Sequence, residues 1–357
     1  MRRQRYVLFG DGDSPHLLKW GRALAPHMEL WAASSRGFSS GFDSVVAPDR
    51  RLALGTDPKV GGGNIGMLRE LPRLARWLRD VRADWIHAHY LTSHGTLAWA
   101  ARAFFRVPGR LVGSAWGSDI LVAPSRSAVI RVVTSRVLRA CTLTTSDSQA
   151  MAARMRELGA REVMVFPFGL EAMPDESTAK EPWLFFANRG LEPAYAPHRV
   201  LQIFSSIAAW QPHARLVVAN DGSLRSALER EAVSMGLAER VQFTGRLDGH
   251  QQDQWYARAR WYLSLPETDS VSVSVLEAMA HGCVPVLSDL AANRELVRDG
   301  ENGLIVSGSN LGRAVFEGMI EKAEAIAAHN REWVLQNGMF EPAVQKFLAR
   351  LGELSEP

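Results

Sequence analysis

Cysteine and long apolar runs are scarce in this sequence, and each shortage excludes a class of protein. Only Cys141 and Cys283 occur in 357 residues, so a disulfide framework is not expected and a reducing cytosol is the simplest location. No apolar run reaches the length of a membrane-spanning helix. The apolar core near the N-terminus is only Tyr6–Phe9 and ends in Gly-Asp-Gly-Asp, which predicts a first β-strand instead of a signal peptide.

A strong charge of either sign is also missing, because 41 Lys and Arg against 38 Asp and Glu leave a net charge of +3. No stripe interleaves arginine with exposed aromatic residues, so a nucleic-acid partner is not expected. The first half nevertheless concentrates arginine. A solvated surface accounts for this, and the sharper interpretation is a cytoplasmic face in peripheral contact with anionic membrane lipid or a phosphorylated acceptor. These arginines include Arg102, Arg106, Arg110, Arg126, Arg131, Arg136 and Arg139.

The sequence does contain a regular alternation of short apolar strands and amphipathic helices, which predicts βαβ units around parallel sheets. Trp85–Ala88 and Arg110–Ala115 are strand candidates of the first half, and a second series starts at Trp183–Ala187. In that second half, helices are expected at Leu224–Met235, with Ser223 as N-cap, and at Asn310–Ala328.

The expected fold class is α/β, with two doubly wound Rossmann-like domains facing across a cleft. The polar, acidic segment 171–181 has no apolar periodicity and is interpreted as a linker. It separates an N-terminal domain, 1–170, from a C-terminal domain, 182–338. A last helix, 339–357, is expected to return to the N-terminal domain.

The segment from Pro266 to Val306 carries the most informative chemistry. Asp269 and Glu277 lie eight positions apart, with Glu277 predicted at the start of a helix, and an apolar strand and a D-G-x-N-G turn follow. Backbone N–H groups at a helix start favour an anion, and a carboxylate beside them accepts hydrogen bonds from ribose hydroxyls. This chemistry suits a nucleotide diphosphate.

The sequence resembles the retaining glycosyltransferases of sequence family 4, which have the GT-B fold and use nucleotide-sugar donors. The motifs that carry the resemblance are LEAMAHGCVPVLSD, RELVRDGENGLIV and VVANDGSLRSALEREAVSMGLAERVQFTGRL, with ADWIHAHY and TTSDSQAMAARMRELGA in the first half. The patterns S-x-W-G-S-D and R-x-L-x-P-x-Y are similar to those of a subgroup. The resemblance implies a metal-independent enzyme with no cofactor, the nucleotide-sugar being a substrate.

The resemblance also implies the donor-binding residues. Glu277 matches the second acid of the family's E-x7-E motif and would bind the donor ribose. The structural alternative is a first-turn Glu that only stabilises its helix. Asp269 stands where the family usually has the first Glu, which contacts the sugar or the reacting centre; the alternative is a turn Asp. Arg189 resembles the donor-phosphate arginine, and the family's usual lysine a few residues later is missing.

The phosphate-binding loop departs from the family pattern, because Ser272 and Ser274 stand where many members have Gly-x-Pro. Amides of Ser272, Ser274, Val275 and Leu276 are expected to face the donor phosphates, and the serines can also serve as N-caps. Arg246 is a further candidate for neutralising phosphate charge, with an ordinary surface arginine as the alternative.

On the acceptor side, Gly12 closes a Gly-rich loop whose amides are expected near the donor, and His16 follows it. The same loop is a weak dinucleotide fingerprint, and its Asp11/Asp13 pair has the D-x-D form of a metal site, although no metal is expected. Trp116 stands where many family members have a histidine; a tryptophan cannot act as a base there, but it can stack on a sugar face or shape the acceptor pocket.

Asp119 and His89 are the other catalytic candidates of the first half. Asp119 either supports the site or holds its turn by an Asx-type hydrogen bond. His89 ends the strand before Trp116 and is the nearest other imidazole, with a structural role as the alternative. His16, likewise, is expected either on the acceptor side or as a helix-start residue without chemistry.

The function expected is transfer of a sugar, with retention, from a nucleotide diphosphate of UDP, GDP or TDP type to a saccharide or lipid-linked saccharide. Bacterial surface polysaccharide biosynthesis is the setting that the resemblance implies. Two alternatives stay open: a nucleotide-sugar epimerase of similar architecture, and a degenerate homologue that binds the donor and acts as a partner protein. Base, sugar, acceptor and linkage are set by variable loops.

Overall fold

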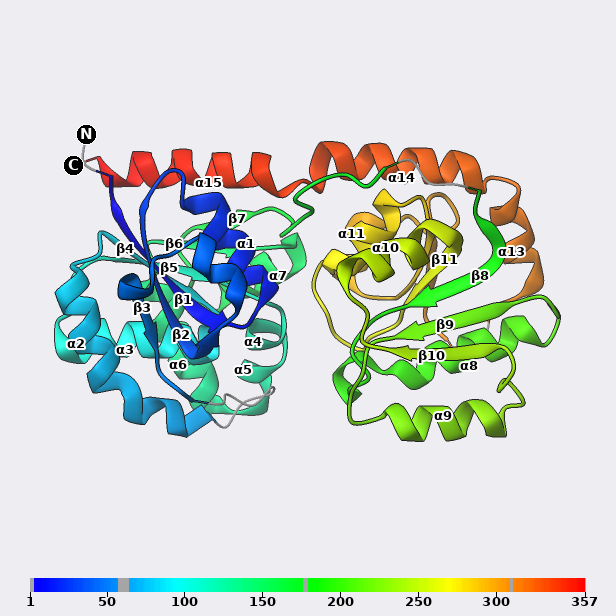
Figure 1. Cartoon of the computed structure of the whole chain (residues 1–357), viewed down its shortest axis with the longest axis horizontal. Coiled ribbons are helices and arrows are strands. Elements are labelled where there is room, and N and C mark those ends of the chain that lie inside the picture. Colours follow the sequence, from blue (N-terminus) through cyan, green and yellow to red (C-terminus); the bar gives the residue numbers. More distant parts are fainter. Residues whose placement is uncertain (1–2, 57–63, 176–178, 309–310, 357) are drawn as a thin grey trace. The chain divides into compact units, whose positions relative to one another are not determined.

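The chain divides into two compact units, Met1–Phe166 with Glu341–Pro357 and Pro167–Phe340 (Figure 1). The computed structural model describes residues 3–56, 64–175, 179–308 and 311–356. Three residues of the predicted linker and the first residue of the predicted helix Asn310–Ala328 lie outside this described part. No helix within the described part combines the length and the apolarity that a bilayer crossing requires.

Unit 1 is built on a parallel sheet with the strand order β3-β2-β1-β4-β5-β6-β7. Strand order reverses between β1 and β4, which is the topological switch point of a doubly wound fold. The strands are β1 (Arg5–Gly12), β2 (Glu29–Phe38), β3 (Arg51–Ala53), β4 (Trp85–His89), β5 (Arg110–Ser114), β6 (Leu143–Ser146) and β7 (Val163–Val165).

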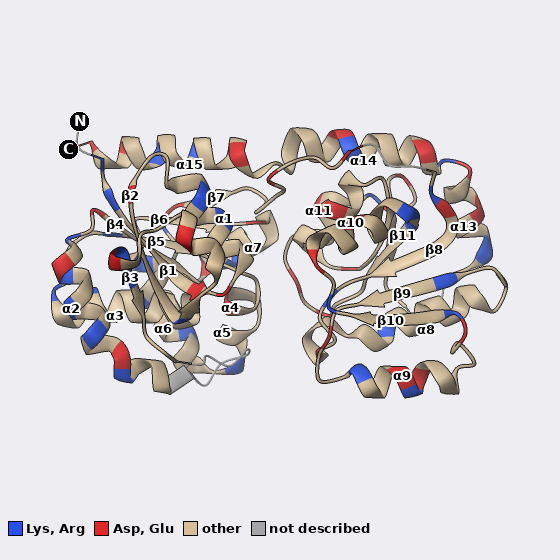
Figure 2. Ribbon diagram, viewed as in Figure 1, with Lys and Arg blue, Asp and Glu red and all other residues tan. Residues whose placement is uncertain are grey.

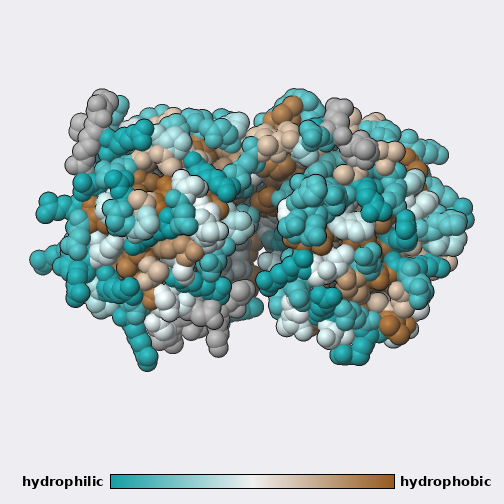
Figure 3. Space-filling view, in the orientation of Figure 1, coloured by the Kyte–Doolittle hydropathy of each residue, from teal (hydrophilic) through white to brown (hydrophobic). Residues whose placement is uncertain are grey.

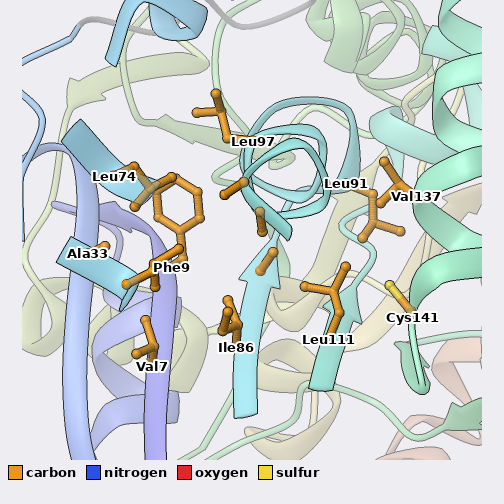
Figure 4. Close-up of a cluster of buried hydrophobic side chains, with 14 of the residues drawn as sticks. Val7, Phe9, Ala33, Leu74, Ile86, Leu91, Leu97, Leu111, Val137 and Cys141 are labelled. Carbon is orange, nitrogen blue, oxygen red and sulfur yellow. The ribbon is translucent and has the colours of Figure 1, made fainter. Parts of the chain in front are cut away.

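Helices cover both faces of this sheet, so its central strands are buried on both sides, as parallel strands usually are. All five residues of β4 are buried. Figure 4 shows one of the resulting clusters, in which Phe9 and Ile86 of the sheet pack with Leu74 and Leu97. The helices are α1 (Pro15–Leu24), α2 (Leu71–Val81), α3 (Thr96–Phe105), α4 (Ser118–Leu121), α5 (Ala123–Arg126), α6 (Ala128–Ala140), α7 (Gln149–Glu157) and α15 (Phe340–Ser355).

Unit 2 repeats the architecture with the order β10-β9-β8-β11-β12-β13, again wholly parallel, and its switch point lies between β8 and β11. Successive residues of β8 point to opposite faces: Phe185 joins one buried cluster and Phe186 the other. The strands are β8 (Glu181–Ala187), β9 (Arg215–Ala219), β10 (Val241–Gly245), β11 (Ala259–Ser264), β12 (Val284–Ser288) and β13 (Leu304–Val306).

Charged residues lie mostly on the helices and loops that surround the two sheets (Figure 2), and the surface is mainly hydrophilic with scattered apolar residues (Figure 3).

The helices of unit 2 are α8 (Pro197–Ala208), α9 (Arg225–Ser234), α10 (Gly249–Arg258), α11 (Val273–Ala280), α12 (Ala291–Leu296), α13 (Arg313–Ile320) and α14 (Ala323–Asn337).

The predicted fold class is confirmed, and most differences are local. The expected single helix Asn310–Ala328 is wrong, because the chain breaks after α13 at Glu321–Lys322 and a second helix continues to Asn337. Ser223 is not the N-cap of α9; Leu224 occupies that position. The Ser223 hydroxyl and amide instead donate to the carboxylate of Glu192, at 2.5 and 2.8 Å.

Residues from both ends of the chain pack together in unit 1. Phe347 of α15 is fully buried, with its ring centroid 5.1 Å from that of Trp20 and 5.7 Å from that of His87. On the same helix Arg350 donates to both carboxylate oxygens of Glu162, at 2.6 and 2.9 Å. The C-terminal helix therefore completes the core of unit 1.

We predict that Phe347→Ala lowers the free energy of unfolding of unit 1 by about 3 to 5 kcal/mol, because it removes a fully buried ring and leaves a cavity. Urea denaturation followed by tryptophan fluorescence measures the loss. Leu335→Ala on α14 is the control, since that side chain is 52% exposed and its removal costs little. Equal effects of the two variants would contradict the packing role of α15.

Candidate active site

The polar residues singled out in unit 2 gather at the carboxyl edge of its sheet. Arg189 follows β8, Arg246 follows β10, and Asp269 lies in the loop after β11. Because β8 and β11 are neighbours at the switch point, Arg189 and Asp269 meet there although they are 80 residues apart in sequence. Open α/β sheets bind their ligands at this position.

Arg189 is held on three sides. Its guanidinium donates to Asp269 Oδ2 at 2.6 Å and to the Ser272 hydroxyl, and it lies over the ring of Tyr195 at 4.5 Å from the centroid. The side chains of Arg189 and Asp269 are only 18% and 19% exposed. Burial is the largest single influence on the pKa of Arg189 and lowers it, but Asp269 and the neighbouring tyrosines together raise it by more, so the net pKa is raised. Burial raises the pKa of Asp269, although the positive charge of Arg189 acts to lower it.

The R-x-L-x-P-x-Y pattern explains how Tyr195 reaches Arg189. Leu191 is buried, and Pro193 opens a 3-10 turn, Pro193–Tyr195, that brings the chain back toward Arg189. A side chain at Gly190 would meet the Tyr195 ring at 3.2 Å, so glycine allows the close return. The pattern alone gave Tyr195 no role, and its spacing to Arg189 was the signal available.

The loop before α11 differs from the expected capped helix start. Ser272 occupies the N-cap position, but its side chain does not cap the helix; it accepts from Arg189 instead. The amides of Val275 and Leu276 donate to the Ser272 carbonyl, and both side chains are buried in the core. Val275 and Leu276 therefore serve the helix, and only the amides of Val273 and Ser274 precede its first hydrogen bonds.

Glu277 is the fifth residue of α11, so it lies beyond the first turn where the helix dipole acts most strongly. Its carboxylate is fixed by a side chain instead. The Tyr256 hydroxyl lies 3.0 Å from Glu277 Oε2 and donates to it or to the Ser274 carbonyl at 3.2 Å. Tyr256 belongs to α10 and is buried, and its burial raises its pKa well above the ordinary value, so the hydroxyl keeps its proton.

Asn188, directly before Arg189, connects this tyrosine to the sheet. Its Nδ2 donates to the Tyr256 hydroxyl and to Gln252 Oε1, each at 2.7 Å, and its Oδ1 accepts from the Tyr262 hydroxyl at 2.7 Å. Because Asn188 donates to Tyr256, the tyrosine proton is directed toward α11. No sequence pattern signalled this relay, since its members are joined only by the fold.

Arg246 is exposed, and within the described residues its side chain makes no ion pair or hydrogen bond. Gly12, the other donor candidate outside α11, lies in unit 1 and is buried. Its amide donates to the Ser34 hydroxyl at 2.8 Å, and a Cβ there would meet the Gly37 carbonyl at 2.3 Å. Glycine at position 12 is therefore needed for the packing of β1 against the end of β2.

At the carboxyl edge of unit 1, three of the predicted residues form one aromatic cluster. The Trp116 ring lies 5.0 Å from His16 and 5.8 Å from His89, centroid to centroid. His89 continues the stack to His87 at 4.2 Å. His87 is hydrogen-bonded at both nitrogens, to the Tyr6 hydroxyl at 2.9 Å and the Ser114 hydroxyl at 2.6 Å, so its role is structural.

His89 differs from His87, because neither of its ring nitrogens has a hydrogen-bond partner among the described residues, although it is only 4% exposed. Burial, and after it the neighbouring histidines, lower its pKa well below the ordinary value. The imidazole is therefore neutral, with one donor and one acceptor available at the switch point of unit 1.

Asp119 holds the loop that carries Trp116. Its fully buried carboxylate accepts from the amides of Trp116 at 2.9 Å and Leu91 at 2.7 Å, which ties the turn after β5 to the π-helical turn Leu91–Gly95 after β4. Burial raises the pKa of Asp119 to about 6, in opposition to these amides. Asp119 thus holds this loop through amides that precede it in the chain, and these two hydrogen bonds are not those of an Asx turn.

No group of three or more His, Cys, Asp or Glu side chains in the described part of the chain is arranged to hold a metal ion. The Asp11/Asp13 pair has other contacts: Asp11 Oδ1 accepts from the Asp13 amide at 3.2 Å, and Asp11 Oδ2 lies 3.8 Å from Arg36 Nη1. Cys141 and Cys283 are both buried and free.

Two parallel doubly wound sheets, each with polar residues at its carboxyl edge, define the GT-B class of fold. Residues 14–169 match the family described as glycosyl transferase 4-like domain, and residues 171–320 match glycosyl transferases group 1. These two matches and the fold together support the GT-B glycosyltransferase family 4 to which the sequence motifs point.

Individual relatives are distant. The lipopolysaccharide core biosynthesis mannosyltransferase LpcC of Rhizobium leguminosarum bv. viciae is 31% identical over 114 residues, 31% of this chain and 32% of LpcC. A GDP-mannose:cellobiosyl-diphosphopolyprenol alpha-mannosyltransferase of Xanthomonas oryzae pv. oryzae is 26% identical over 124 residues, 33% of this chain and 30% of that protein. The matches thus span about a third of these relatives.

Solved structures show the fold over nearly the whole chain. HepE from Anabaena, in complex with UDP-glucose, superposes with a TM-score of 0.79 over 98% of this chain and 100% of HepE, at 16% identity. Sucrose-phosphate synthase from Thermosynechococcus elongatus gives a TM-score of 0.77 over 99% and 100% of the two chains, at 15% identity. At such identities the likeness establishes the fold.

We predict that Asp119→Asn destabilises unit 1 by about 1 to 3 kcal/mol, because the new amide group faces a backbone N–H that loses its acceptor. The pKa of Asp119 rises from 3.8 to about 6 on folding, so the folded state holds the proton more tightly and wild-type stability falls as pH rises through this window. The deficit of the variant should therefore be larger at pH 4 than at pH 7.

Urea denaturation at steps from pH 4 to pH 7 measures this difference, with Asp49→Asn on the exposed turn Pro48–Arg50 as a control of equal charge change. A deficit that grows with pH would contradict the assignment, because it would mean that the ionised carboxylate is the form that folding favours.

Proposed function

We propose that this chain is a retaining glycosyltransferase that moves a sugar from a nucleotide diphosphate to a saccharide or lipid-linked saccharide. The observation that carries the proposal is the Arg189 site, in which a nearly buried guanidinium lies at the switch point of unit 2 beside the start of α11. A fixed guanidinium stabilises charge that develops on a departing nucleoside diphosphate, and it needs little reorganisation during the reaction.

Asp269 is proposed to hold Arg189 in place in addition to any contact with the donor sugar. Its carboxylate is one methylene shorter than the family's glutamate, and it bonds Arg189 at 2.6 Å. Ser272 and Tyr195 fix the other sides of the guanidinium, and Ser274 offers an amide at the helix start. Arg246 supplies a second positive charge at the same edge of the sheet.

Glu277 is proposed to bind the ribose hydroxyls, with Tyr256 and Asn188 as positioning residues. A carboxylate that already accepts a hydrogen bond from Tyr256 is held in one orientation, so a ribose binds without first having to order the side chain. Tyr256 receives a hydrogen bond from Asn188, the neighbour of Arg189. The relay therefore couples the proposed phosphate site to the proposed ribose site.

The His16–Trp116–His89 cluster is proposed as the part that receives the acceptor or the donor sugar. Trp116 presents an indole face on which a sugar can stack, and the neutral His89 supplies a hydrogen-bond donor and an acceptor. Because its pKa is low, His89 is suited to orienting a hydroxyl and poorly suited to carrying a positive charge. Asp119 keeps Trp116 in place through the backbone.

Bacterial surface polysaccharide biosynthesis is the proposed setting. LpcC is described as a lipopolysaccharide core enzyme, and the Xanthomonas relative acts on a diphosphopolyprenol-linked disaccharide according to its name. Such acceptors lie at membranes, and α6 exposes Val129 and Val132, 72% and 58% accessible, beside Arg131 and Arg136. We therefore also propose peripheral contact with an anionic membrane, on the cytoplasmic side where nucleotide-sugars are made.

We predict that Arg189 and Glu277 recognise different parts of the nucleotide. Arg189→Gln should lower the affinity for the nucleotide (UDP, GDP or TDP) and for inorganic diphosphate by at least about tenfold, because charge-assisted hydrogen bonds to phosphate are lost. Glu277→Gln should lower the affinity for the nucleotide by a similar factor and leave the affinity for inorganic diphosphate unchanged. Isothermal titration calorimetry with each ligand separates the two effects.

Arg189→Lys keeps the charge without the guanidinium fork and guards against misfolding around an unpaired Asp269; we expect it to fall between wild type and Arg189→Gln. Arg230→Gln and Glu239→Gln, at exposed positions of unit 2, are the charge-matched controls. Nucleotide binding that is unchanged in both Arg189 variants would overturn the proposed function. Transfer activity, measured with the nucleotide-sugar that binds best, tests the proposed function directly.

We predict that Tyr256→Phe weakens nucleotide binding about three- to tenfold, through loss of one hydrogen bond to Glu277, and does not change the affinity for inorganic diphosphate. Tyr6→Phe is the matched control, because it removes a buried tyrosine hydroxyl from unit 1. If Tyr256→Phe weakened the binding of both ligands equally, the role of Tyr256 would be general support of the fold and not positioning of Glu277.

A further inference from the structure

Four arginines line one hollow at the amino-terminal edge of the sheet of unit 1. The hollow has a volume of about 860 Å³ and is lined by Arg79, Arg82, Arg106 and Arg110. They come from four places in the chain: the last turn of α2, the residue after α2, the residue after α3 and the first residue of β5. None of them was assigned to the site at the carboxyl edge.

The four guanidinium groups of the hollow lack ion-pair partners in the described part of the chain. Within the described residues none of them makes an ion pair or a hydrogen bond, and the only ring contact is that of Arg110 over Trp85, at 5.5 Å from the centroid. Asp84 is the acidic residue of the lining, and it accepts from the Arg5 amide at 2.8 Å. Four positive charges and one negative leave +3, as large as the net charge of the whole chain.

Local backbone preference does not explain the convergence. Arg82 and Arg106 are in the left-handed region, with φ of 51° and 54°, where glycine or asparagine would cost less. A basic residue at a helix C-terminus interacts favourably with the dipole, which accounts for arginine in the last turn of a helix. That effect does not account for Arg110, which begins a strand, or for four like charges that repel one another in one hollow.

We propose that this arginine hollow, defined by Arg79, Arg82, Arg106 and Arg110, binds an anion that carries two or more phosphate groups. Guanidinium forks bind phosphate oxygens in pairs, and such a ligand would relieve the repulsion among the arginines. The volume falls in the range of sites for organic ligands and exceeds the need of a single inorganic ion. The phosphates can belong to a free metabolite or to lipid headgroups.

The arginine hollow is separate from the proposed donor and acceptor residues. It opens beside Trp85, the first residue of β4, whereas His89 is the last, so the four steps along the strand put roughly 13 Å between them. A ligand in the hollow cannot take part in sugar transfer by direct contact. The inference therefore does not depend on the proposed function.

The test measures binding of inorganic tripolyphosphate by calorimetry in a chain carrying Arg189→Gln, so that the proposed donor site does not contribute. Arg82→Asn with Arg106→Asn removes two charges at positions where asparagine suits the backbone, so folding should be preserved. We expect the affinity to fall by about a hundredfold, roughly tenfold for each arginine. Arg76→Gln with Arg156→Gln, exposed in the same unit and outside the lining, should leave it unchanged.

A second arm distinguishes the two phosphate sources. Lipid headgroups are the source if the chain cosediments with phosphatidylglycerol vesicles, does not cosediment with neutral phosphatidylcholine vesicles, and loses the phosphatidylglycerol binding with Arg82→Asn and Arg106→Asn. Vesicle binding unaffected by these substitutions, together with loss of tripolyphosphate binding, identifies a free anion. The proposal is overturned if tripolyphosphate does not bind, or if the Arg76 and Arg156 substitutions weaken it as much as those in the hollow.

Discussion

The ion pair between Arg189 and Asp269 is the interaction on which the candidate donor site depends. It joins the loops after β8 and β11, two neighbouring strands, and so fixes the switch point of unit 2 from both sides. Ser272 and Tyr195 complete the surroundings of the guanidinium, and Asn188 links it to Tyr256 and Glu277. A buried charge is tolerated because each partner is compensated, and removing one would leave the other unpaired at high cost.

Unit 1 uses burial differently at the two edges of its sheet. At the carboxyl edge, burial keeps His89 neutral and raises the pKa of Asp119, so the residues around Trp116 work through hydrogen bonds and ring contacts. At the amino edge, the four arginines of the hollow make no ion pair among the described residues. One sheet thus offers a neutral, aromatic surface at one end and a positive one at the other.

The cluster proposed for the donor and the cluster proposed for the acceptor differ in charge and in polarity. A nucleoside diphosphate requires positive charge and N–H donors, and we propose Arg189 and the start of α11 for this role in unit 2. A saccharide is neutral and presents hydroxyls and apolar faces, and the Trp116–His89 cluster suits it.

The sequence by itself determined the α/β class, most strands and helices, and which polar residues follow a strand, because hydrophobic periodicity and the order of elements are local properties. It could place Arg189 and Asp269 each after a strand, but only the tertiary structure decided that they meet, since β8 and β11 become neighbours through the strand order. The tertiary structure also pairs the Ser272 hydroxyl with Arg189 instead of the helix start, and it begins α11 early enough that Glu277 lies beyond the first turn. It places Tyr256 beside Glu277 and gathers four arginines from distant parts of the chain in one hollow. These are contacts between segments far apart in the chain, and no local pattern encodes them.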